Sequence, residues 1–490
     1  MSFIKTFFAL FWMLCVVVMS HHYIGHVSDD GAIFLRYVEN IIAEEGLVFN
    51  PGEYVEGYSS PLWLLLLCLF SIFVPVSVVP KVLGVVFLWC SFILLYKRLS
   101  HSQSFEIQQF IFGIVTLFGG SFYWMGTGME TPLLCFLWVG LAVFWNTKIG
   151  ILSLSLLGIA RPEGPLLVIL GIFLWKSSNP LTLRSKRWFA LFPSVTWFFF
   201  RVFYYGDILP NTYYAKTGGD FFTQISRGFE YTYQFFIPVL ALGILHYNTE
   251  EKSITSVYVL IFVEVLVIFL GGGDWMLWGR MLVPLWFCWW LCFPRVEIKN
   301  PKHILLLGIS LWGIWPLFIS SKALQVAFDG RKIPIAGYQE GSLSEMSLEQ
   351  AKFIQEFVAS KKMDSNKITI AVNHAGFLPF YLEEYKFIDM TGLNNKYIAK
   401  YSKGELHSKY DVEYILEQEP DMIIFHSPQK PISKKPFVQG RYWEGESKIL
   451  QDKRFWTHYE FQKNYWQRQG QGATILYSLL AIRKSNFEKK

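Results

Sequence analysis

Apolar segments separated by short polar loops fill the first part of the chain. They fall at 5–22, 62–79, 82–96, 105–121, 132–146, 150–160, 165–175, 188–204, 234–246, 254–270, 281–294 and 303–320. Several are shorter than the roughly 20 residues of a full membrane crossing, as expected where helices are broken or tilted. The pattern predicts a polytopic α-helical membrane domain over residues 1–320.

Beyond about residue 320 the pattern becomes that of a soluble domain. Apolar positions in Ser344–Lys361 recur at helical spacing, and Val412–Leu416 predicts a second helix. Strands are predicted at Ile368–Val372, Phe387–Ile388, Met422–Phe425 and Ala473–Ile482. Pro428–Phe455 is predicted to be a loop. Alternating helices and strands predict a small α/β domain with a partly parallel sheet over 321–490.

The loop after the first apolar segment, residues 23–79, carries many charges. Apolar residues recur at helical spacing just after Asp29 and Asp30, at Ile33, Phe34, Tyr37, Val38 and Ile41. This spacing predicts an amphipathic helix that lies on the membrane surface and holds both carboxylates near the lipid headgroups. The alternative is that Asp29 only caps the helix and the glutamates of the loop are solvated.

The membrane topology depends on whether Leu62–Val79 crosses the bilayer. Pro75 and Pro80 interrupt this segment, which favours a half-buried helix belonging to the first loop. About eleven spans then remain, and the basic loops lie in the cytoplasm, as the positive-inside rule requires. These loops contain Lys97, Arg98, Lys148, Lys176, Arg184, Lys186, Arg187, Lys252, Arg295, Lys299 and Lys302. The acidic loops and residues 321–490 then face outward together. If the segment spans instead, the acidic loops scatter over both faces.

Composition narrows the class of protein further. The chain of 490 residues is 52% hydrophobic and 18% aromatic, with a mean hydropathy of +0.31, which excludes an ordinary soluble protein. The net charge of +6 lies in loops where topology explains it, so no nucleic-acid partner is indicated. All six cysteines fall in apolar segments, which leaves no disulfide framework, thiol nucleophile or zinc ligand set in the exported domain. The first segment lacks a small-residue cleavage site and is expected to remain as a helix.

Several motifs carry a resemblance to a known family. They are DDGAIFLRY at 29–37, GLVFNPGEYVEGYSSPLW at 46–63, GMETPL at 128–133, ARPEG at 160–164, GDILPNTYYAK at 206–216 and GGDWMLWGRMLVP at 272–284. In this order, over about the first three hundred residues, the sequence resembles GT-C glycosyltransferases similar to the mycobacterial terminal arabinofuranosyltransferases.

This resemblance implies a GT-C-like fold and a bacterial inner-membrane glycosyltransferase whose active site and C-terminal domain face the periplasm. The donor would be a sugar on a polyprenyl phosphate, arabinofuranose among the candidates, and the acceptor a glycan or lipid. Asp29 and Asp30 are the candidate catalytic carboxylates, since a base must accept the proton of the acceptor hydroxyl. A single displacement inverts the anomeric centre, whereas retention needs two carboxylates in separate roles, and both remain open. No cofactor is predicted, although a divalent cation is left open.

Other polar residues are assigned to substrate binding, each with a structural alternative. Lys216 and Arg280 stand beside aromatic residues and are predicted to hold the lipid phosphate, although interfacial anchoring explains them too. Asp274 is predicted either to bind sugar hydroxyls or to form an ion pair with Arg280. Glu130 either serves the site or interacts with the helix that Pro132 begins. The remaining candidates are Arg36, Glu53, Glu56 and Tyr58 of the first loop, Arg161 and Glu163, which could instead form a salt bridge, and Asp207 and Asn211, which could instead form a turn.

Two other classes of function fit parts of the sequence. A transporter for lipid-linked sugars would also bury charges among helices, but no internal repeat is evident. A non-catalytic envelope assembly or motor-control protein would tolerate loss of Asp29 and Asp30 and depend on the C-terminal domain. His374 is predicted to be structural or an acceptor contact.

Overall fold

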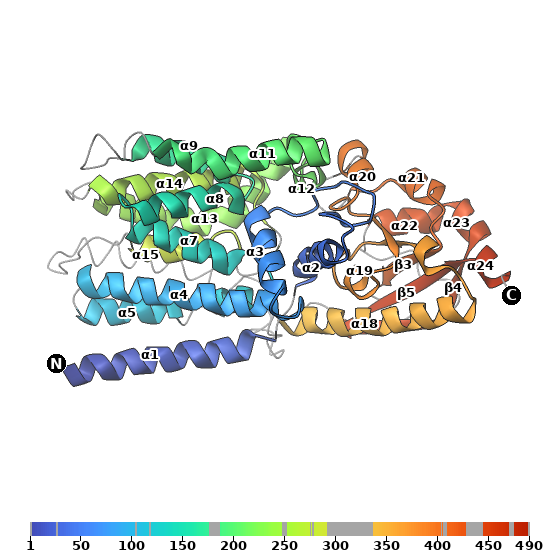
Figure 1. The fold of residues 1–490 in the computed structure, drawn as a ribbon, viewed down its shortest axis with the longest axis horizontal. Coiled ribbons are helices and arrows are strands. Elements are labelled where there is room, and N and C mark those ends of the chain that lie inside the picture. The colour runs from blue at the N-terminus through green and yellow to red at the C-terminus, as the bar shows by residue number, and fades with distance from the viewer. Residues whose placement is uncertain are drawn as a thin grey trace.

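The protein consists of a bundle of helices with an α/β domain attached to one end (Figure 1). The computed structural model describes residues 2–25, 28–102, 105–116, 119–175, 187–246, 252–274, 276, 279–291, 337–402, 404, 409–427, 444–469 and 475–488. The predicted domain boundary at 320 and the apolar segment 303–320 lie outside these residues.

The bundle and its loops contain mainly α-helices. Their bounds are α1 Ser2–Tyr23, α2 Asp29–Ile42, α3 Pro61–Ser71, α4 Val79–Ser102, α5 Phe105–Thr116, α6 Gly119–Gly126, α7 Thr131–Val143, α8 Lys148–Ala160, α9 Gly164–Leu174, η1 Arg187–Leu191, α11 Phe192–Tyr205, α12 Asn211–Lys216, α13 Phe221–His246, α14 Lys252–Leu270 and α15 Val283–Leu291. Proline occupies the first turn of α3, α7, α9 and α11, where its missing N–H costs no helical hydrogen bond.

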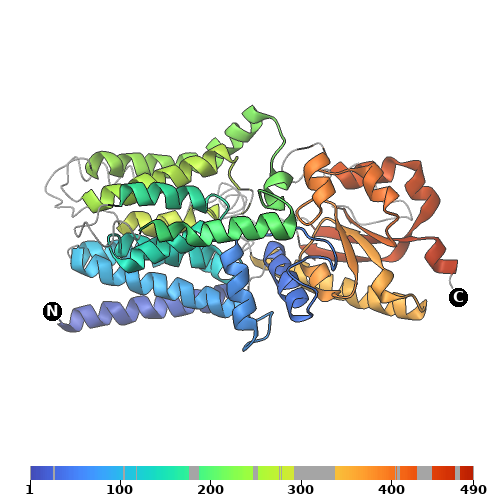
Figure 2. The same ribbon diagram turned by 45° about the horizontal axis from the view of Figure 1, so that its top comes forward.

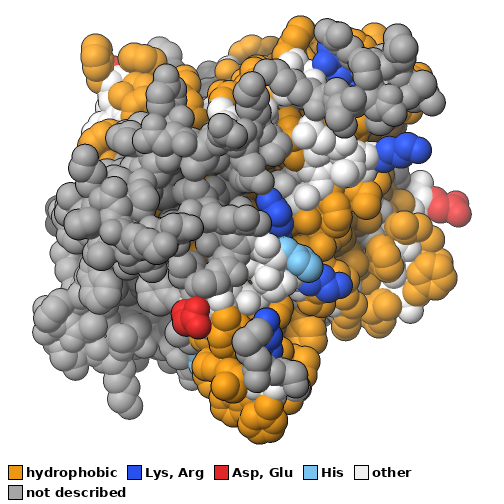
Figure 3. Space-filling view, turned by 90° about the vertical axis from the view of Figure 1, so that its left-hand side faces the viewer, with side chains coloured by type: hydrophobic (Ala, Val, Ile, Leu, Met, Phe, Trp, Pro, Cys, Tyr) orange, Lys and Arg blue, Asp and Glu red, His pale blue; other side chains and the backbone are white. Residues whose placement is uncertain are grey.

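Two of the described helices are long and apolar enough to cross a membrane, Phe3–Tyr23 and Val79–His101. Other apolar helices of the bundle are 10–17 residues long, so the predicted number of about eleven spans stays a prediction. Large hydrophobic side chains such as Phe3, Phe173 and Phe203 are exposed along the bundle. Seen from the end away from the α/β domain, hydrophobic side chains surround scattered Lys and Arg (Figure 3). An uncovered apolar surface of this kind suits contact with lipid.

The segment Leu62–Val79 is divided, as the two prolines suggested. Helix α3 has 11 residues and ends at Ser71, and α4 begins only at Val79. At 1.5 Å per residue, α3 is too short to cross a bilayer, and it runs across the end of the bundle rather than along it (Figure 1). The prediction that this segment does not span is therefore supported.

The C-terminal domain is built on a mixed five-stranded sheet in the order β2-β1-β3-β5-β4. Strands β1 to β3 are parallel, and β5 pairs antiparallel with β3 and β4. This confirms the predicted partly parallel sheet. The elements are α18 Gly337–Ser360, η3 Ser365–Lys367, β1 Thr369–Val372, α19 Phe377–Tyr381, β2 Lys386–Asp389, α20 Lys396–Tyr401, α21 Val412–Glu417, β3 Met422–Ser427, α22 Glu444–Gln451, α23 Lys453–His458, β4 Tyr459–Gln469, β5 Ile475–Arg483 and α24 Ser485–Glu488.

Helices cover both faces of this sheet, so its strands are apolar on both sides (Figure 2). Ile370 of β1 packs in a cluster with residues of α18, while the next residue, Ala371, packs in a second cluster with residues of α20, α21 and α23. Alternate side chains of a strand point to opposite faces, which explains this division. The first cluster continues into the helical bundle, so the two halves of the molecule share a hydrophobic core.

One prediction was wrong. Residues 444–455 are not a loop but belong to α22 and α23, and the long strand β4 after them was not predicted; residues 428–443 lie outside the described part. Helix α2 forms as predicted, and its position relative to the membrane surface stays a prediction. Nine of its residues are buried, and it packs against α3, α18 and α19.

Candidate active site

The two aspartates stand in the first turn of α2, which is fixed against the loop before α7. Ser28 N–H donates to Thr127 O over 3.0 Å, and the Trp63 indole donates to Gly128 O over 2.9 Å. A Cβ added to Gly31 would lie 2.4 Å from Thr127 O, so glycine is required for this close approach. The loop that carries Glu130 is thereby held beside Asp29 and Asp30.

Asp29 and Asp30 point to different surroundings. The Asp29 carboxylate accepts hydrogen bonds from the Gly376 N–H at 3.2 Å and the Phe377 N–H at 2.9 Å, both in the C-terminal domain. Asp30 instead lines a pocket between the bundle and that domain. Asp29 is therefore positioned to hold the two domains together, and Asp30 is the carboxylate that faces open space.

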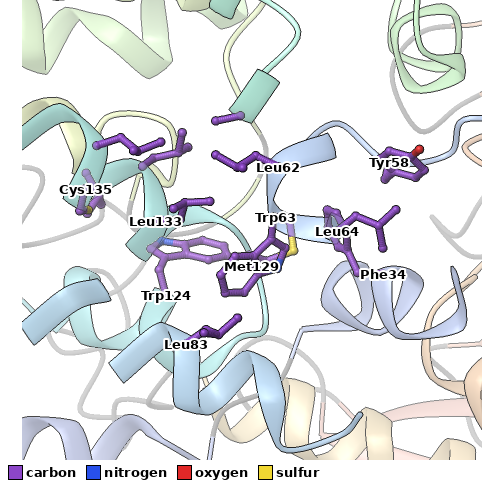
Figure 4. Packing of buried hydrophobic residues seen from close by; sticks show 14 of the residues in the cluster. Phe34, Tyr58, Leu62, Trp63, Leu64, Leu83, Trp124, Met129, Leu133 and Cys135 are labelled. Atoms are coloured by element: carbon purple, nitrogen blue, oxygen red, sulfur yellow. The ribbon is translucent and has the colours of Figure 1, made fainter. Parts of the chain in front are cut away.

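This pocket, which we call the junction pocket, contains about 350 Å³ of empty space, part of which is bulk solvent at its mouth. It is lined by Asp30, Ile33, Phe34, Gly57, Tyr58, Ser59, Met129, Thr212, Lys216, Arg280 and Leu393. Figure 4 shows Phe34 on α2 with Tyr58 and Met129 on the loops near it. One carboxylate, two cations and apolar walls thus meet at the place where the bundle ends.

The charged groups of the junction pocket influence one another. Enclosure by protein raises the pKa of Asp30 above its ordinary value, while Arg280 and Lys216 lower it. Burial also lowers the pKa of Lys216, and the neighbouring Arg280 adds to this effect. Burial alone would raise the pKa of Asp274, but Arg280 and Lys216 outweigh it and leave that pKa lowered. Arg280 Nε lies 2.8 Å from Asp274 Oδ2, so the predicted pairing is formed.

Arg280 also lines a second pocket deeper in the bundle, together with Glu130, Arg161 and Glu264. Arg161 donates to Glu130 over 2.9 Å and to Glu163 over 2.9 Å. Glu130 and Glu163 precede α7 and α9 at the N-cap position, yet neither side chain caps its helix. Both face Arg161 instead. The Glu130 atom Oε2 is buried without a hydrogen-bond partner among the described residues, which is rare outside functional sites.

The remaining predicted residues lie away from the junction pocket, except Tyr58, whose hydroxyl contacts that of Tyr205 at 2.9 Å. Glu56 is paired with Arg201 and accepts a hydrogen bond from Trp197. The others hold the C-terminal domain: Arg36 bonds to Pro379 O, Leu382 O and Tyr385 O, Glu53 to Lys386, Asp207 to Lys396 and Lys400, and Asn211 to Gly392 O and Leu393 O. These contacts favour a structural role for them over direct substrate binding.

The pocket residues that were not predicted include Glu264, Thr212 and Leu393. Glu264 is the ionisable residue inside the apolar run of α14, and such residues are rare in membrane helices and usually functional. A single charged residue in an apolar helix could therefore have identified Glu264 from the sequence. Thr212 and Leu393 gave no such signal, because neither their type nor their spacing distinguishes them. Leu393 comes from the C-terminal domain.

No three His, Cys, Asp or Glu side chains come together as a metal site within the described part of the chain. Acidic and basic groups alternate in the two pockets, so the carboxylates are balanced by Arg161, Lys216 and Arg280. These cations are the groups in the site that could hold an anion.

Comparisons with known proteins match two different parts of the chain. Residues 337–477 match the model of a domain of unknown function, DUF8728. The chain is 26% identical over 269 residues to the terminal β-(1→2)-arabinofuranosyltransferase of Mycobacterium tuberculosis, covering 46% of this chain and 42% of that protein. It is 57% identical over 37 residues to the enzyme of the same name from Corynebacterium glutamicum, covering 8% of this chain and 5% of that protein.

The matched stretches thus span less than half the length of these curated relatives. Among solved structures, the crystal structure of ArnT from Cupriavidus metallidurans bound to undecaprenyl phosphate aligns with a TM-score of 0.49 and 10% identity, over 86% of this chain and 92% of that one. The predicted similarity to the mycobacterial terminal arabinofuranosyltransferases is therefore confirmed.

Proposed function

We propose that the protein is a membrane glycosyltransferase that moves a sugar from a polyprenyl monophosphate to an extracytoplasmic glycan or lipid. The observation that carries the proposal is the junction pocket, where Asp30 lies with Lys216 and Arg280. A carboxylate and two cations are the groups that transfer from a lipid phosphate requires. The donor arrives in the membrane, so no nucleotide site is needed.

The cations are suited to the departing phosphate. Arg280 offers a planar set of donors that can bind two phosphate oxygens at once, and Lys216 adds a second charge. As the bond between the anomeric carbon and the phosphate oxygen breaks, negative charge grows on that oxygen, and fixed cations stabilise it. Asp274 keeps Arg280 in place through their ion pair.

Asp30 is suited to accept the proton of the acceptor hydroxyl. Enclosure raises its pKa, which makes the carboxylate a stronger base, while Arg280 and Lys216 act in the opposite direction and favour its ionised form. The hydroxyl oxygen forms the new bond to the anomeric carbon, its proton passes to Asp30, and the lipid phosphate leaves with the electron pair of the broken bond. A mechanism that retains the anomeric configuration needs a second carboxylate, and Glu130 in the second pocket is the candidate for that role.

The sugar is proposed from the relatives. Two of them are named terminal β-(1→2)-arabinofuranosyltransferases, which supports a pentofuranose such as arabinofuranose as the transferred group. The C-terminal domain and the acidic loops lie at the same end of the bundle (Figure 1). With the positive-inside rule this favours a pocket that opens to the periplasm.

The test is transfer from a radiolabelled polyprenyl-phosphate arabinofuranose in nanodiscs containing the purified protein. We expect labelled product with the wild type and none above background with Asp30→Asn. A panel of pentose and hexose donors identifies the sugar. Equal product from wild type and Asp30→Asn would contradict the assigned mechanism.

A further inference from the structure

The second pocket lies inside the bundle, where helices α7, α8, α9, α14 and α15 meet. Glu130 and Thr131 line it at the start of α7, and Glu264 lines it from within α14. It shares a wall with the junction pocket, because Arg280 lines both. Met129 lines the junction pocket, and the next residue, Glu130, lines the second pocket. A group bound to Arg280 is therefore beside both spaces.

Three oxygen atoms of the residues around this pocket are buried and unpaired. Glu130 Oε2, Thr131 Oγ1 and Glu264 Oε2 have no hydrogen-bond partner among the described residues. The three residues are 1%, 1% and 5% exposed, respectively. A buried polar atom costs free energy unless another group pairs with it. Three such atoms around one space therefore indicate that a polar group of a ligand binds between them.

The charges around the pocket disfavour an anionic group. Arg161 is already paired with Glu130 and Glu163. Arg280 is paired with an aspartate of its own loop. Glu264 adds a further carboxyl group inside an apolar helix, where an ionisable residue is costly and usually functional. A phosphate or carboxylate of a ligand would meet more carboxyl groups than guanidinium groups in this pocket.

The size of the free space limits what can enter. It amounts to about 10 Å³, which is close to the room that one water-sized group needs. A sugar ring does not fit there, but a single hydroxyl group at the edge of a ring does. A hydroxyl both donates and accepts, so it can pair with Glu264 whether or not that carboxyl group carries a proton. It can also pair with the hydroxyl of Thr131.

We propose that one hydroxyl of the donor sugar enters the second pocket and pairs with Glu264 and Thr131, which makes these two residues determinants of donor specificity. The proposal rests on the proposed function, because it concerns the sugar of the lipid whose phosphate Arg280 would hold. That sugar is joined directly to the phosphate, so its ring lies beside the wall that the two pockets share. Glu264 and Thr131 form and break no covalent bond, and Glu130 keeps the role proposed above.

The test combines variants of the protein with donors that each lack one hydroxyl. Full-length protein in nanodiscs is given polyprenyl-phosphate arabinofuranose, its monodeoxy analogues, or polyprenyl phosphate without a sugar, and the dissociation constant of each lipid is measured directly. We expect the wild type to bind one analogue about 10- to 100-fold more weakly than the complete donor, as the loss of a hydrogen bond to a charged group allows. Glu264→Met should reduce this ratio to about threefold or less, and Thr131→Val should reduce it by a smaller factor.

Glu230→Met is the matched control, because Glu230 is an exposed carboxylate of α13 and does not line either pocket. It should keep the ratio of the wild type. Binding of polyprenyl phosphate without a sugar should be the same in the wild type and in all variants. If Glu264→Met weakens the binding of every lipid equally, Glu264 supports the fold of the site and the proposal is overturned.

The proposal and the proposed function can fail separately. If the wild type binds all analogues equally, or if Glu264→Met and Thr131→Val leave the ratio unchanged, the hydroxyl subsite is overturned and a buried water alone fills the space. Transfer of the sugar by the wild type would still support the proposed function in that case. Selective binding that the variants lose, with no transfer by the wild type, would support the subsite while removing the proposed function.

Discussion

Two buried arginines of this chain, Arg36 and Arg280, have opposite kinds of partner. Arg36 is 0% exposed, and its guanidinium group donates hydrogen bonds to one backbone carbonyl in its own loop and to three in the C-terminal domain. Arg280 is 4% exposed, pairs with Asp274 and lines two pockets. Both are buried charges at the junction. The two arginines differ in their partners. The backbone carbonyls around Arg36 indicate a structural role, whereas the pockets beside Arg280 indicate a role in ligand binding.

The same contrast holds for the two adjacent aspartates. Asp29 is bound by two N–H groups of the other domain, and Asp30 faces the junction pocket. These neighbouring residues of one helix turn thus have different roles, since Asp29 joins the two domains and Asp30 is the proposed catalytic base. Substitution of a residue of the first kind should therefore change stability, and substitution of one of the second kind should change activity.

The largest effect is expected for Asp30→Asn. Loss of the base should lower kcat by about 10³-fold, measured by sugar transfer in nanodiscs. Because folding raises the pKa of Asp30, its ionised form costs stability once the pH is above that pKa. The variant should therefore melt at the same or a higher temperature. A lower melting temperature together with the lost activity would indicate a structural role.

Arg36→Met should act on stability instead. It leaves carbonyls of Pro379, Leu382 and Tyr385 without their donor, at a cost of about 3 kcal/mol. Thermal unfolding in detergent and limited proteolysis between the domains would measure this. Arg454→Met is the control, because Arg454 and its partner Glu413 are solvent-exposed and its other partner Asp452 is only partly buried, so these ion pairs contribute less to stability. Equal stability of the two variants would contradict the structural role of Arg36.

Arg280→Met should weaken donor use, and it also leaves the buried Asp274 without its ion-pair partner. Loss of a charged hydrogen bond to phosphate should raise the donor KM about 10- to 100-fold, or lower kcat by a similar factor. Initial rates over a range of donor concentrations separate the two. If neither constant changes, Arg280 does not bind the phosphate.

Gly376→Ala tests whether the domain contact through Asp29 matters for catalysis. Its Cβ would collide with Asp29 O, so Asp29 must move and α2 with it. We expect about a tenfold loss of transfer activity, since small displacements of catalytic groups are costly. Gly25→Ala is the control, because nothing lies within 4 Å of its added Cβ. Full activity of Gly376→Ala would show that Asp30 does not depend on this contact.

The smallest effect is a shift in the pH profile. Asp30 is active when ionised, so activity falls as the pH drops through its pKa. Lys216 lowers that pKa, and Lys216→Met should move the acid limb of kcat/KM upward by up to about one pH unit. The midpoint is the readout, because the overall rate will also fall. A downward shift of this midpoint would contradict the effect of Lys216 on the pKa of Asp30.

Much of the fold follows from local pattern. The helical spacing after Asp29, the division of Leu62–Val79 and the strands β1, β2, β3 and β5 all correspond to runs that were visible in the sequence. Strand β4 and helices α22 and α23 were not visible. The sequence around them is polar, and their apolar residues, such as Phe455 and Phe461, are buried only because β5 and β3 lie beside them.

Local sequence patterns predict the candidate site less completely than they predict the fold. The motifs indicated which residues carry charge, and the topology indicated which face they share. Their partners could not be predicted, because Arg36 and Pro379 are separated by 343 residues and Glu56 and Arg201 by 145. Whether a charged residue binds substrate or another domain depends on such contacts.

The most direct test of the account is a structure of the protein in nanodiscs with a bound polyprenyl phosphate. The account predicts that the phosphate lies in the junction pocket, with oxygens about 3 Å from the side-chain nitrogens of Arg280 and Lys216 and with Asp30 beside it. A phosphate bound elsewhere, with the junction pocket empty, would contradict it.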